Sequence, residues 1–413
     1  HDRRVVVRYQ PFQAARGLPR AVWILAAAAF VNRAGTMVVP FLTLYLTRRL
    51  GFAPGVAGVM FLVYGASAIV GNALAGRLCD RVGARRVLVG CLALSGAALF
   101  AFPCAATPVG VACAVCAFAL TSEGVRPSTL TLVGAMVEPS RRKDAFVVNR
   151  LAVNLGMSIG PGIGGVLVDS HPHALFYVDG ATSIAAASLV VALGRYLARS
   201  APGVAPPQES AGPAKAARGA LGDPRFLRFL AGVVCVGFVF FQLDGALPLY
   251  LVGAHGMSPK VYGLLFIINT AMILAFEVPL NSATSRWPHA RALAVGAGLV
   301  AVGFGGFALG TTFWSAGACI VVITCGEMIL FPAMSAFVAD AAPEGRGGAY
   351  MGAFSTAFAI AYAVAPAAGI AVLGRFGGAA LWCALLVTGA LTAALFVVVG
   401  RDKTPDSEAA ADT

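Results

Sequence analysis

The sequence predicts an all-α polytopic membrane protein with twelve transmembrane helices in two pseudo-symmetric six-helix bundles. The first observation is composition: 59% of the 413 residues are hydrophobic and 12% are charged, a balance outside that of soluble domains. The second is a series of apolar stretches that each reach the roughly 20 residues needed to span a bilayer. The third is an internal repeat, because identical residues recur at one constant spacing.

Each apolar stretch is bounded by a short polar interval and is therefore predicted as one spanning helix. Several are longer than a bilayer needs, which indicates tilt or kinks, and prolines inside them are predicted to kink the backbone by removing a donor. These prolines are Pro40, Pro127, Pro161, Pro248, Pro279, Pro332 and Pro366. The predicted spans are 21–46, 54–75, 87–105, 108–137, 145–168, 173–196, 224–252, 259–284, 290–310, 312–340, 348–373 and 377–400.

The basic side chains orient these helices. With the amino terminus placed in the cytoplasm, 23 of the 30 Lys and Arg fall in cytoplasmic segments, 4 in the opposite loops and three within spans. Basic residues concentrate on the cytoplasmic side, so both termini are predicted to be cytoplasmic in a multi-pass protein of the cell (inner) membrane. Contact with acidic lipid headgroups accounts for the net charge of +12, and we expect no nucleic-acid partner. No short apolar segment with a small-residue cleavage site opens the chain, so no cleaved signal peptide is expected.

The two halves of the chain are copies of one unit. Twelve pairs of identical residues are separated by 205 positions, among them Gly58 and Gly263. One offset that holds across so many helices indicates a duplicated bundle whose copies are related by an axis along the membrane normal. The predicted segments are a cytoplasmic tail at 1–20, a bundle at 21–196, a Pro/Ala/Gly-rich cytoplasmic linker at 197–222, a second bundle at 223–400 and a cytoplasmic tail at 401–413.

A polar segment, residues 76–86, interrupts the apolar pattern between the second and third predicted helices. It cannot lie in hydrocarbon and is predicted as a hinge at the membrane surface. Together with the repeat, it resembles the major facilitator superfamily, and the resemblance covers residues 21–400. The family signature is Gly-x-x-x-Asp-Arg-x-Gly-basic-basic, which is matched here by Gly76, Asp80, Arg81, Gly83 and Arg85, with Ala84 at the first basic position and Arg86 following.

The resemblance implies that this segment is a gate. In the family the aspartate lies against the amino terminus of the eleventh helix and pairs with a nearby arginine, which holds the halves together on the cytoplasmic side. An anion at a helix amino terminus is favoured by about 0.3–1 kcal/mol. Asp80 is therefore expected to gate rather than to bind substrate. The copy in the second half has Ser285 in place of the acid.

The fifth predicted helix carries a glycine-rich motif that resembles the glycine-proline motif of the family's proton-coupled, drug/proton antiporter-like exporters. Glycines every four residues form a smooth stripe against which another helix can pack closely, and tight packing alone is the alternative interpretation. The motif residues are Gly156, Gly160, Pro161, Gly164 and Gly165.

Charged side chains inside the spans are costly, at about 2.5–3.5 kcal/mol each near mid-bilayer on insertion scales. The resemblance implies a central cavity lined by helices 1, 4, 7 and 10 and flanked by helices 2, 5, 8 and 11, where most of these charges fall. Asp179, in helix 6, is expected to cap or anchor a helix end. The candidate substrate or proton-coupling residues are Arg33, Glu123, Arg126, Asp244, Glu277 and Glu327, with Arg150 a further charge within the spans.

Two interpretations of the charges on helices 1 and 4 are open. Glu123 and Arg126 are three residues apart and are expected to share a helix face and pair, with Arg33 across the cavity. This is either a static neutral cluster or a site where Glu123 exchanges a proton and the arginines bind an anionic group of the substrate. Asp244, Glu277 and Glu327, in the second half, are expected to have no intramembrane cation beside them, so proton binding is predicted chiefly at Glu277 and Glu327.

These features favour a secondary active transporter that exports small amphipathic organic molecules by alternating access in exchange for protons. The alternative is a proton-coupled symporter or facilitator of an anionic or zwitterionic solute. No enzyme is expected, since no catalytic His or Cys constellation is present. No cofactor or metal is expected: the pair Cys113 and Cys116 lacks further ligands, and the proton gradient is the expected driving force. The expected partners are a small-molecule substrate and membrane lipid, and the chain is expected to act as a monomer.

Overall fold

The computed structural model describes residues 17–138, 141–200, 222–343 and 347–401, and within these ranges all regular structure is helical. Eleven described segments are long and apolar enough to span a membrane. The last, Tyr350–Gly400, has 51 residues and is interrupted at Gly377, where φ is 81°. A bilayer core needs only about 20 helical residues, so this segment holds two of the predicted spans, which gives the twelve that the sequence predicts. Most of the predicted tails and linker, at 1–16, 201–221 and 402–413, lies outside the described residues.

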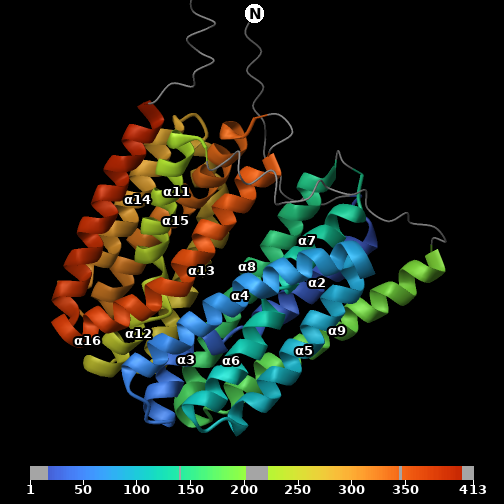
Figure 1. Ribbon diagram of the computed structural model, residues 1–413, viewed down its shortest axis with the longest axis horizontal. Coiled ribbons are helices and arrows are strands. Elements are labelled where there is room, and N and C mark those ends of the chain that lie inside the picture. The colour runs from blue at the N-terminus through green and yellow to red at the C-terminus, as the bar shows by residue number, and fades with distance from the viewer. Residues whose placement is uncertain (1–16, 139–140, 201–221, 344–346, 402–413) are drawn as a thin grey trace, which may run out of the picture.

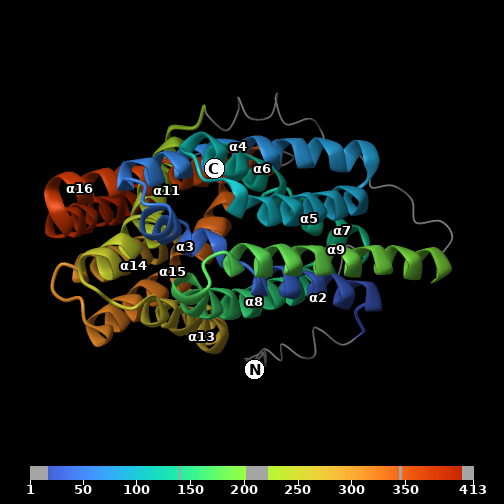
Figure 2. The same cartoon turned by 90° about the horizontal axis from the view of Figure 1, so that it is seen from below.

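The helices form two groups that follow the order of the chain (Figures 1 and 2). The first group comprises α2 (Arg20–Ala34), α3 (Val38–Leu44), η1 (Tyr45–Arg49), α4 (Pro54–Val82), α5 (Ala84–Ala101), η2 (Phe102–Cys104), α6 (Pro108–Ser122), α7 (Val125–Ala135), α8 (Arg142–Ser170) and α9 (Ala174–Ser200). The second comprises α11 (Pro224–Phe240), η4 (Phe241–Leu243), α12 (Ala246–Pro248), η5 (Leu249–Ala254), α13 (Pro259–Thr284), α14 (His289–Gly306), α15 (Phe313–Ala341) and α16 (Gly347–Arg401).

The internal repeat is visible where the two halves touch. Gly58 of α4 lies against Ala367 of α16, and Gly263 of α13 lies against Gly162 of α8. The two pairs correspond through the offset of 205 residues found in the sequence, because Gly263 is the counterpart of Gly58 and Ala367 is the counterpart of Gly162. The short π-helices η1 and η5 occupy matching places, so the duplication extends from the sequence to the contacts between the halves.

Three of the spans are broken, and each break lies about four residues before a proline. The breaks fall at Gly35–Met37, at Glu123–Gly124 and at Asp244–Gly245, ahead of Pro40, Pro127 and Pro248. Proline has no N–H to donate to the carbonyl four residues earlier, and its ring crowds that carbonyl. The spans around the other prolines, such as Pro161 and Pro332, remain single helices.

The beginning of α2 and the end of α16 lie on one side of the molecule, which we call the termini side. The two halves contact each other closely on the opposite side (Figure 1). On the opposite side Phe41 packs edge-on against Tyr262 at 5.9 Å between ring centroids, within a buried cluster that includes both halves. There Arg48 also donates a hydrogen bond to the Val252 carbonyl. On the termini side the end of α4 is exposed. The broken first and seventh spans also meet across the halves, since Thr43 donates a hydrogen bond to the Asp244 carbonyl oxygen.

Candidate functional site

A cluster of polar side chains lies where the two halves meet near the helix breaks. The Tyr64 hydroxyl of α4 donates a hydrogen bond of 2.7 Å to the Glu123 carboxylate. The Tyr64 ring packs edge-on against Tyr362 of α16, with 5.5 Å between centroids. Arg33 and Asp244 are close enough to interact electrostatically with Tyr362. The structure therefore brings together Arg33, Glu123 and Asp244, which the sequence placed on three different helices.

The expected pair of Glu123 with Arg126 is wrong. The span is broken at Glu123–Gly124, so the two residues do not share one helix face. Among the described residues no ion pair joins them, and Arg126 is exposed. The helix spacing rule holds only within continuous helices.

Asp244 lies at the break in the seventh span, and neighbouring hydroxyls satisfy the backbone there. Thr43 donates to the Asp244 carbonyl oxygen at 3.1 Å, and Tyr262 donates to the Leu243 carbonyl at 2.7 Å. Gly245 lies against the backbone of Pro366. A carbonyl released from a helix in the membrane must find such a partner. The carboxyl group of Asp244 has no ion-pair partner among the described residues.

A second cluster connects α8 of the first half with α13 and α15 of the second. Arg150 forms an ion pair with Glu277, in which the Glu277 side chain is 14% exposed and that of Arg150 56%. Glu327 accepts a hydrogen bond of 2.9 Å from the Asn269 amide, which also donates to Thr324. The expectation that Glu277 has no cation beside it is therefore wrong, because the cation comes from the other half.

A cavity of about 490 Å³ lies within the first half, between α2, α5, α7, α8 and α9. Its polar lining consists of three arginines, three asparagines and a threonine, and the rest of the lining is apolar. The polar residues are Asn32, Arg33, Arg126, Thr129, Asn149, Arg150 and Asn154. Arg33 belongs to this cavity and also lies near the Tyr64–Glu123 pair.

Asp179 caps the broken first span, which confirms the expected anchoring role. It is 4% exposed, and its carboxylate accepts a hydrogen bond of 3.4 Å from the backbone N–H of Met37, just before α3. Ser183, one turn later on α9, accepts from the Asn32 amide at 3.1 Å. A carboxylate at a helix amino terminus satisfies an orphan donor and the helix dipole.

The glycine-rich motif of the fifth span presents two close-packing faces. Gly156, Gly160 and Gly164 lie against the first span, where added side chains would meet Phe30, Thr36 and Phe41. Gly165 faces α13 of the other half, and a side-chain carbon there would lie 2.5 Å from the Pro259 carbonyl oxygen. Pro161 is also at this interface, since its carbonyl lies against Gly263. The motif therefore joins the two halves as well as packing within one.

The residues of the predicted gate lie at the end of α4 and the start of α5. Asp80, Arg81, Arg85 and Arg86 are exposed, and Gly83 ends α4 with φ of 90°. Asp80 has no ion pair within the described ranges. Gly76 has open space around its Cα. Within the described part of the eleventh helix no ion pair or hydrogen bond reaches the Asp80 carboxylate, and the gating role of Asp80 stays a prediction.

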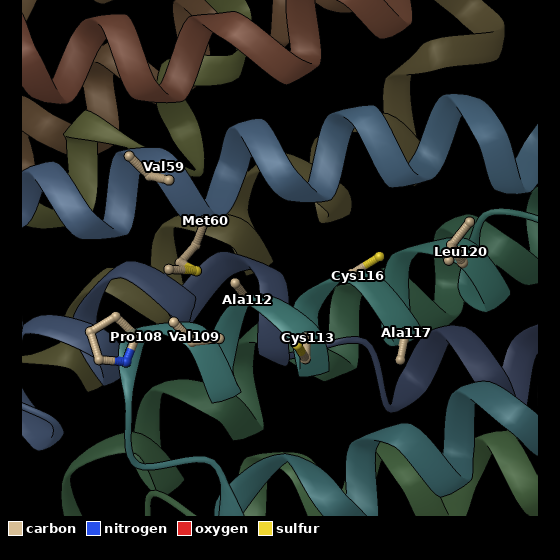
Figure 3. Close-up of a pocket in the computed structure, with 9 residues that line it drawn as sticks. All are labelled: Val59, Met60, Pro108, Val109, Ala112, Cys113, Cys116, Ala117 and Leu120. Carbon is tan, nitrogen blue, oxygen red and sulfur yellow. The ribbon is translucent and has the colours of Figure 1, made fainter.

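A larger hollow of about 630 Å³ lies between α4 and α6 (Figure 3). It is lined by Val59, Met60, Pro108, Val109, Ala112, Cys113, Cys116, Ala117 and Leu120. Val59 and Val109 are strongly exposed, and no charged side chain lines it. The hollow has the character of a lipid-facing surface, because it offers no polar group to orient a substrate.

The chain matches the family model described as Major Facilitator Superfamily over residues 23–366 and again over 245–413. It therefore belongs to the major facilitator superfamily and is a transporter rather than an enzyme. Two relatives are bacterial. An uncharacterised MFS-type transporter, YqjV, of Bacillus subtilis (strain 168) is 25% identical over 80% of each chain. A Na(+), Li(+), K(+)/H(+) antiporter of Planococcus maritimus is 24% identical over 79% of this chain and 83% of its own.

Solved structures of similar fold include the nucleoside transporter NupG, with a TM-score of 0.77 and 16% identity over 93% of this chain and 99% of that one. A POT family transporter in complex with 5-aminolevulinic acid has a TM-score of 0.73 and 17% identity over 95% and 99%. At these identities the likeness concerns the fold alone.

Proposed function

We propose that the protein exports small amphipathic organic molecules in exchange for protons, by alternating access between its two halves. The observation that carries this proposal is a set of three intramembrane carboxyls without an ion pair among the described residues: Glu123, Asp244 and Glu327. The side-chain donors to Glu123 and Glu327 are a neutral phenol and a neutral amide.

A carboxylate without an ion-pair partner in the membrane is neutralised either by binding a proton or by a cationic group of the solute. The two ligands exclude each other on one carboxylate, and mutual exclusion couples the two fluxes in opposite directions. The antiporter among the relatives supports this direction of coupling. Glu277 is better suited to holding the two halves together, because Arg150 already neutralises it.

The orientation of the chain is part of the proposal. The distribution of basic residues supports cytoplasmic termini. The halves then touch on the outer side, through contacts such as that between Phe41 and Tyr262, and the arrangement faces inward. The exposed position of Asp80 supports this, since its gate is expected to form in the outward-facing state.

The second candidate function is proton-coupled symport, or facilitated transport, of an anionic or zwitterionic solute. The arginine-lined cavity favours it, because Arg33 and Arg126 share that cavity. Each proton bound nearby makes the cavity more positive and strengthens the binding of an anion. Anion and proton would then move together.

Single carboxamide substitutions test the carboxyl assignment in proteoliposomes. The variants are Glu123→Gln, Asp244→Asn and Glu327→Gln, with the exposed Glu138→Gln as matched control. A residue that carries the coupling proton loses gradient-driven transport but retains solute counterflow, which needs no net proton movement. Full gradient-driven transport in all three variants and in their triple combination would refute the assignment.

A further inference from the structure

The cavity inside the first half has the dimensions and charge of an anion-binding site. Its volume of about 490 Å³ is in the range of small-molecule sites. Its charged lining residues are Arg33, Arg126 and Arg150, and no aspartate or glutamate lines it. A guanidinium group presents several donors in a geometry that matches carboxylate and phosphate oxygens.

Two of these three arginines have no ion-pair partner in the part of the chain that the structure describes. Arg150 pairs with Glu277, whereas Arg33 and Arg126 form no ion pair among the described residues. Asp179 interacts electrostatically with Arg33, and its carboxylate accepts a hydrogen bond from the Met37 backbone N–H, while Glu123 accepts one from Tyr64. An uncompensated positive charge within a membrane protein is costly, so the cavity favours a ligand that brings negative charge.

Asn149, which also lines this cavity, carries an unsatisfied acceptor. Asn149 is 7% exposed, and its amide oxygen has no hydrogen-bond partner in the part of the chain that the structure describes. A buried acceptor without a partner is rare in folded proteins and costs stability. It would be satisfied by an O–H or N–H group next to the anionic group of a ligand.

The remaining walls are apolar, with Leu92, Val125, Phe146, Val153 and Met157 among them. A fully hydrated inorganic anion would leave these walls in contact with water. A ligand with an apolar body covers them while its anionic end meets the arginines.

We propose that this cavity binds an amphipathic organic anion, with its carboxylate or phosphate group held by Arg33 and Arg126 and a neighbouring donor directed at the Asn149 amide oxygen. The role of such an anion as the transported solute rests on the second candidate function, proton-coupled symport or facilitated transport of an anionic or zwitterionic solute, which it deepens by naming a substrate class. If the solute also carries an ammonium group, that group would be directed toward Glu123, whose hydrogen-bond donor Tyr64 interacts electrostatically with Arg33.

Calorimetric binding to the purified full chain in phosphatidylcholine nanodiscs tests the charge preference. The probes are 1-naphthylacetate, 1-naphthylethylamine and 2-(1-naphthyl)ethanol, which share a ring system and differ in charge. The acid is expected to bind at least tenfold more tightly than the amine and the alcohol. Equal or tighter binding of the amine, or no binding of the acid at millimolar concentration, would overturn the proposal.

Arginine variants locate the site. Arg33→Gln and Arg126→Gln should each weaken binding of the acid about tenfold or more, whereas Arg195→Gln, an exposed arginine of the same half outside the cavity, should leave it unchanged. Arg33→Lys and Arg126→Lys keep the positive charge and should recover part of the affinity. Such recovery separates the loss of charge from misfolding of the glutamine variants. Wild-type affinity in both folded glutamine variants would contradict the site.

The role of Asn149 is tested with a hydroxy acid. Adding a hydroxyl group next to the carboxylate of 1-naphthylacetate should tighten binding to the wild type about threefold, as one hydrogen bond predicts. Asn149→Leu should remove that gain and leave binding of the parent acid nearly unchanged. A gain that persists in Asn149→Leu would remove Asn149 from the site.

The anionic group could come from a soluble acid or from a lipid headgroup, and lipid composition separates the two. Loss of naphthylacetate binding in phosphatidylglycerol nanodiscs would assign the site to an anionic headgroup, and retained binding to a soluble acid. None of these measurements uses a proton gradient. An anion site without proton-coupled transport would refute the proposed function alone, whereas coupled transport without anion binding would refute only this inference.

Discussion

Arg150 of α8 and Glu277 of α13 form an ion pair that joins the two halves of the transporter. Arg150 also lines the cavity of the first half and interacts electrostatically with Glu327 of α15. One arginine thus connects the cavity, the interface between the halves and a candidate proton site.

Removing either partner of this pair should weaken the contact between the halves. We expect Glu277→Gln and Arg150→Gln each to destabilise the protein by about 1–3 kcal/mol, between the values for exposed and buried pairs. The exchange of the two residues in Arg150→Glu combined with Glu277→Arg should recover part of the loss. Thermal unfolding in detergent measures the effect, and strictly additive losses in the double Gln variant would show that the pair does not couple the halves.

The Tyr64 hydroxyl should matter for transport but not for folding. Tyr64→Phe retains the ring that packs on Tyr362 and removes only the donor to Glu123. We expect an unchanged melting temperature and gradient-driven transport reduced about tenfold, since one hydrogen bond to a charged group is worth about 1.5–3 kcal/mol. Tyr177→Phe, at an exposed ring stacked on Phe100, is the matched control. Equal transport in both variants would exclude Tyr64 from coupling.

A side chain at Gly165 should force the halves apart on one side. The Pro259 carbonyl leaves no room there, whereas Gly90 on α5 has open space around it. Gly165→Val is therefore expected to lower the melting temperature by several degrees and to reduce transport, and Gly90→Val to do neither. A thermally normal Gly165→Val protein would mean that this contact contributes nothing to the observed arrangement of the halves.

Asp80→Asn should slow cycling and leave solute affinity near that of the wild type. Asp80 is exposed and lies outside both clusters of the site, and its gate is expected to close only in the other state. Initial rates of transport and equilibrium binding, measured side by side, separate the two effects. A large loss of affinity with normal turnover would contradict the gating role.

The pH dependence of binding should differ in sign between classes of solute. Protonation of Glu123 or Asp244 removes a negative charge, so an amine that binds these carboxylates should bind more weakly as the pH falls. The acid held by Arg33 and Arg126 should bind more tightly under the same change, because the surroundings become more positive. The measurement is the affinity of 1-naphthylacetate and of 1-naphthylethylamine over one pH series. If both affinities change in the same direction with pH, the carboxylates and the arginines do not form separate subsites.

Much of the fold was predictable because it depends on patterns along the chain. The twelve spans and the duplication follow from hydropathy and from one repeated spacing, and the glycine contacts at Gly58 and Gly263 obey the same offset. The breaks were only partly predictable. Proline indicates where a backbone bond is lost, but whether the helix bends or breaks depends on partners such as Thr43, which satisfies the Asp244 carbonyl.

The candidate residues were predictable because placing a charged side chain within a membrane costs free energy. Their partners were not predictable. Glu123 was expected to pair with Arg126 by spacing, and instead accepts from Tyr64, 59 residues away. Glu277 was expected to lack a cation, and the cation is Arg150 of the other half. Contacts between helices far apart in the sequence follow from packing, which a single sequence does not encode as a local pattern.

The most direct test of the central claim is proton flux in proteoliposomes that contain the wild-type protein and a pH-sensitive dye. Candidate solutes are added to one face in the absence of an imposed gradient. Antiport predicts proton movement opposite to the solute, and the triple carboxamide variant of Glu123, Asp244 and Glu327 should abolish it. Proton movement in the same direction as the solute, or solute transport without any proton movement, would contradict proton-coupled export.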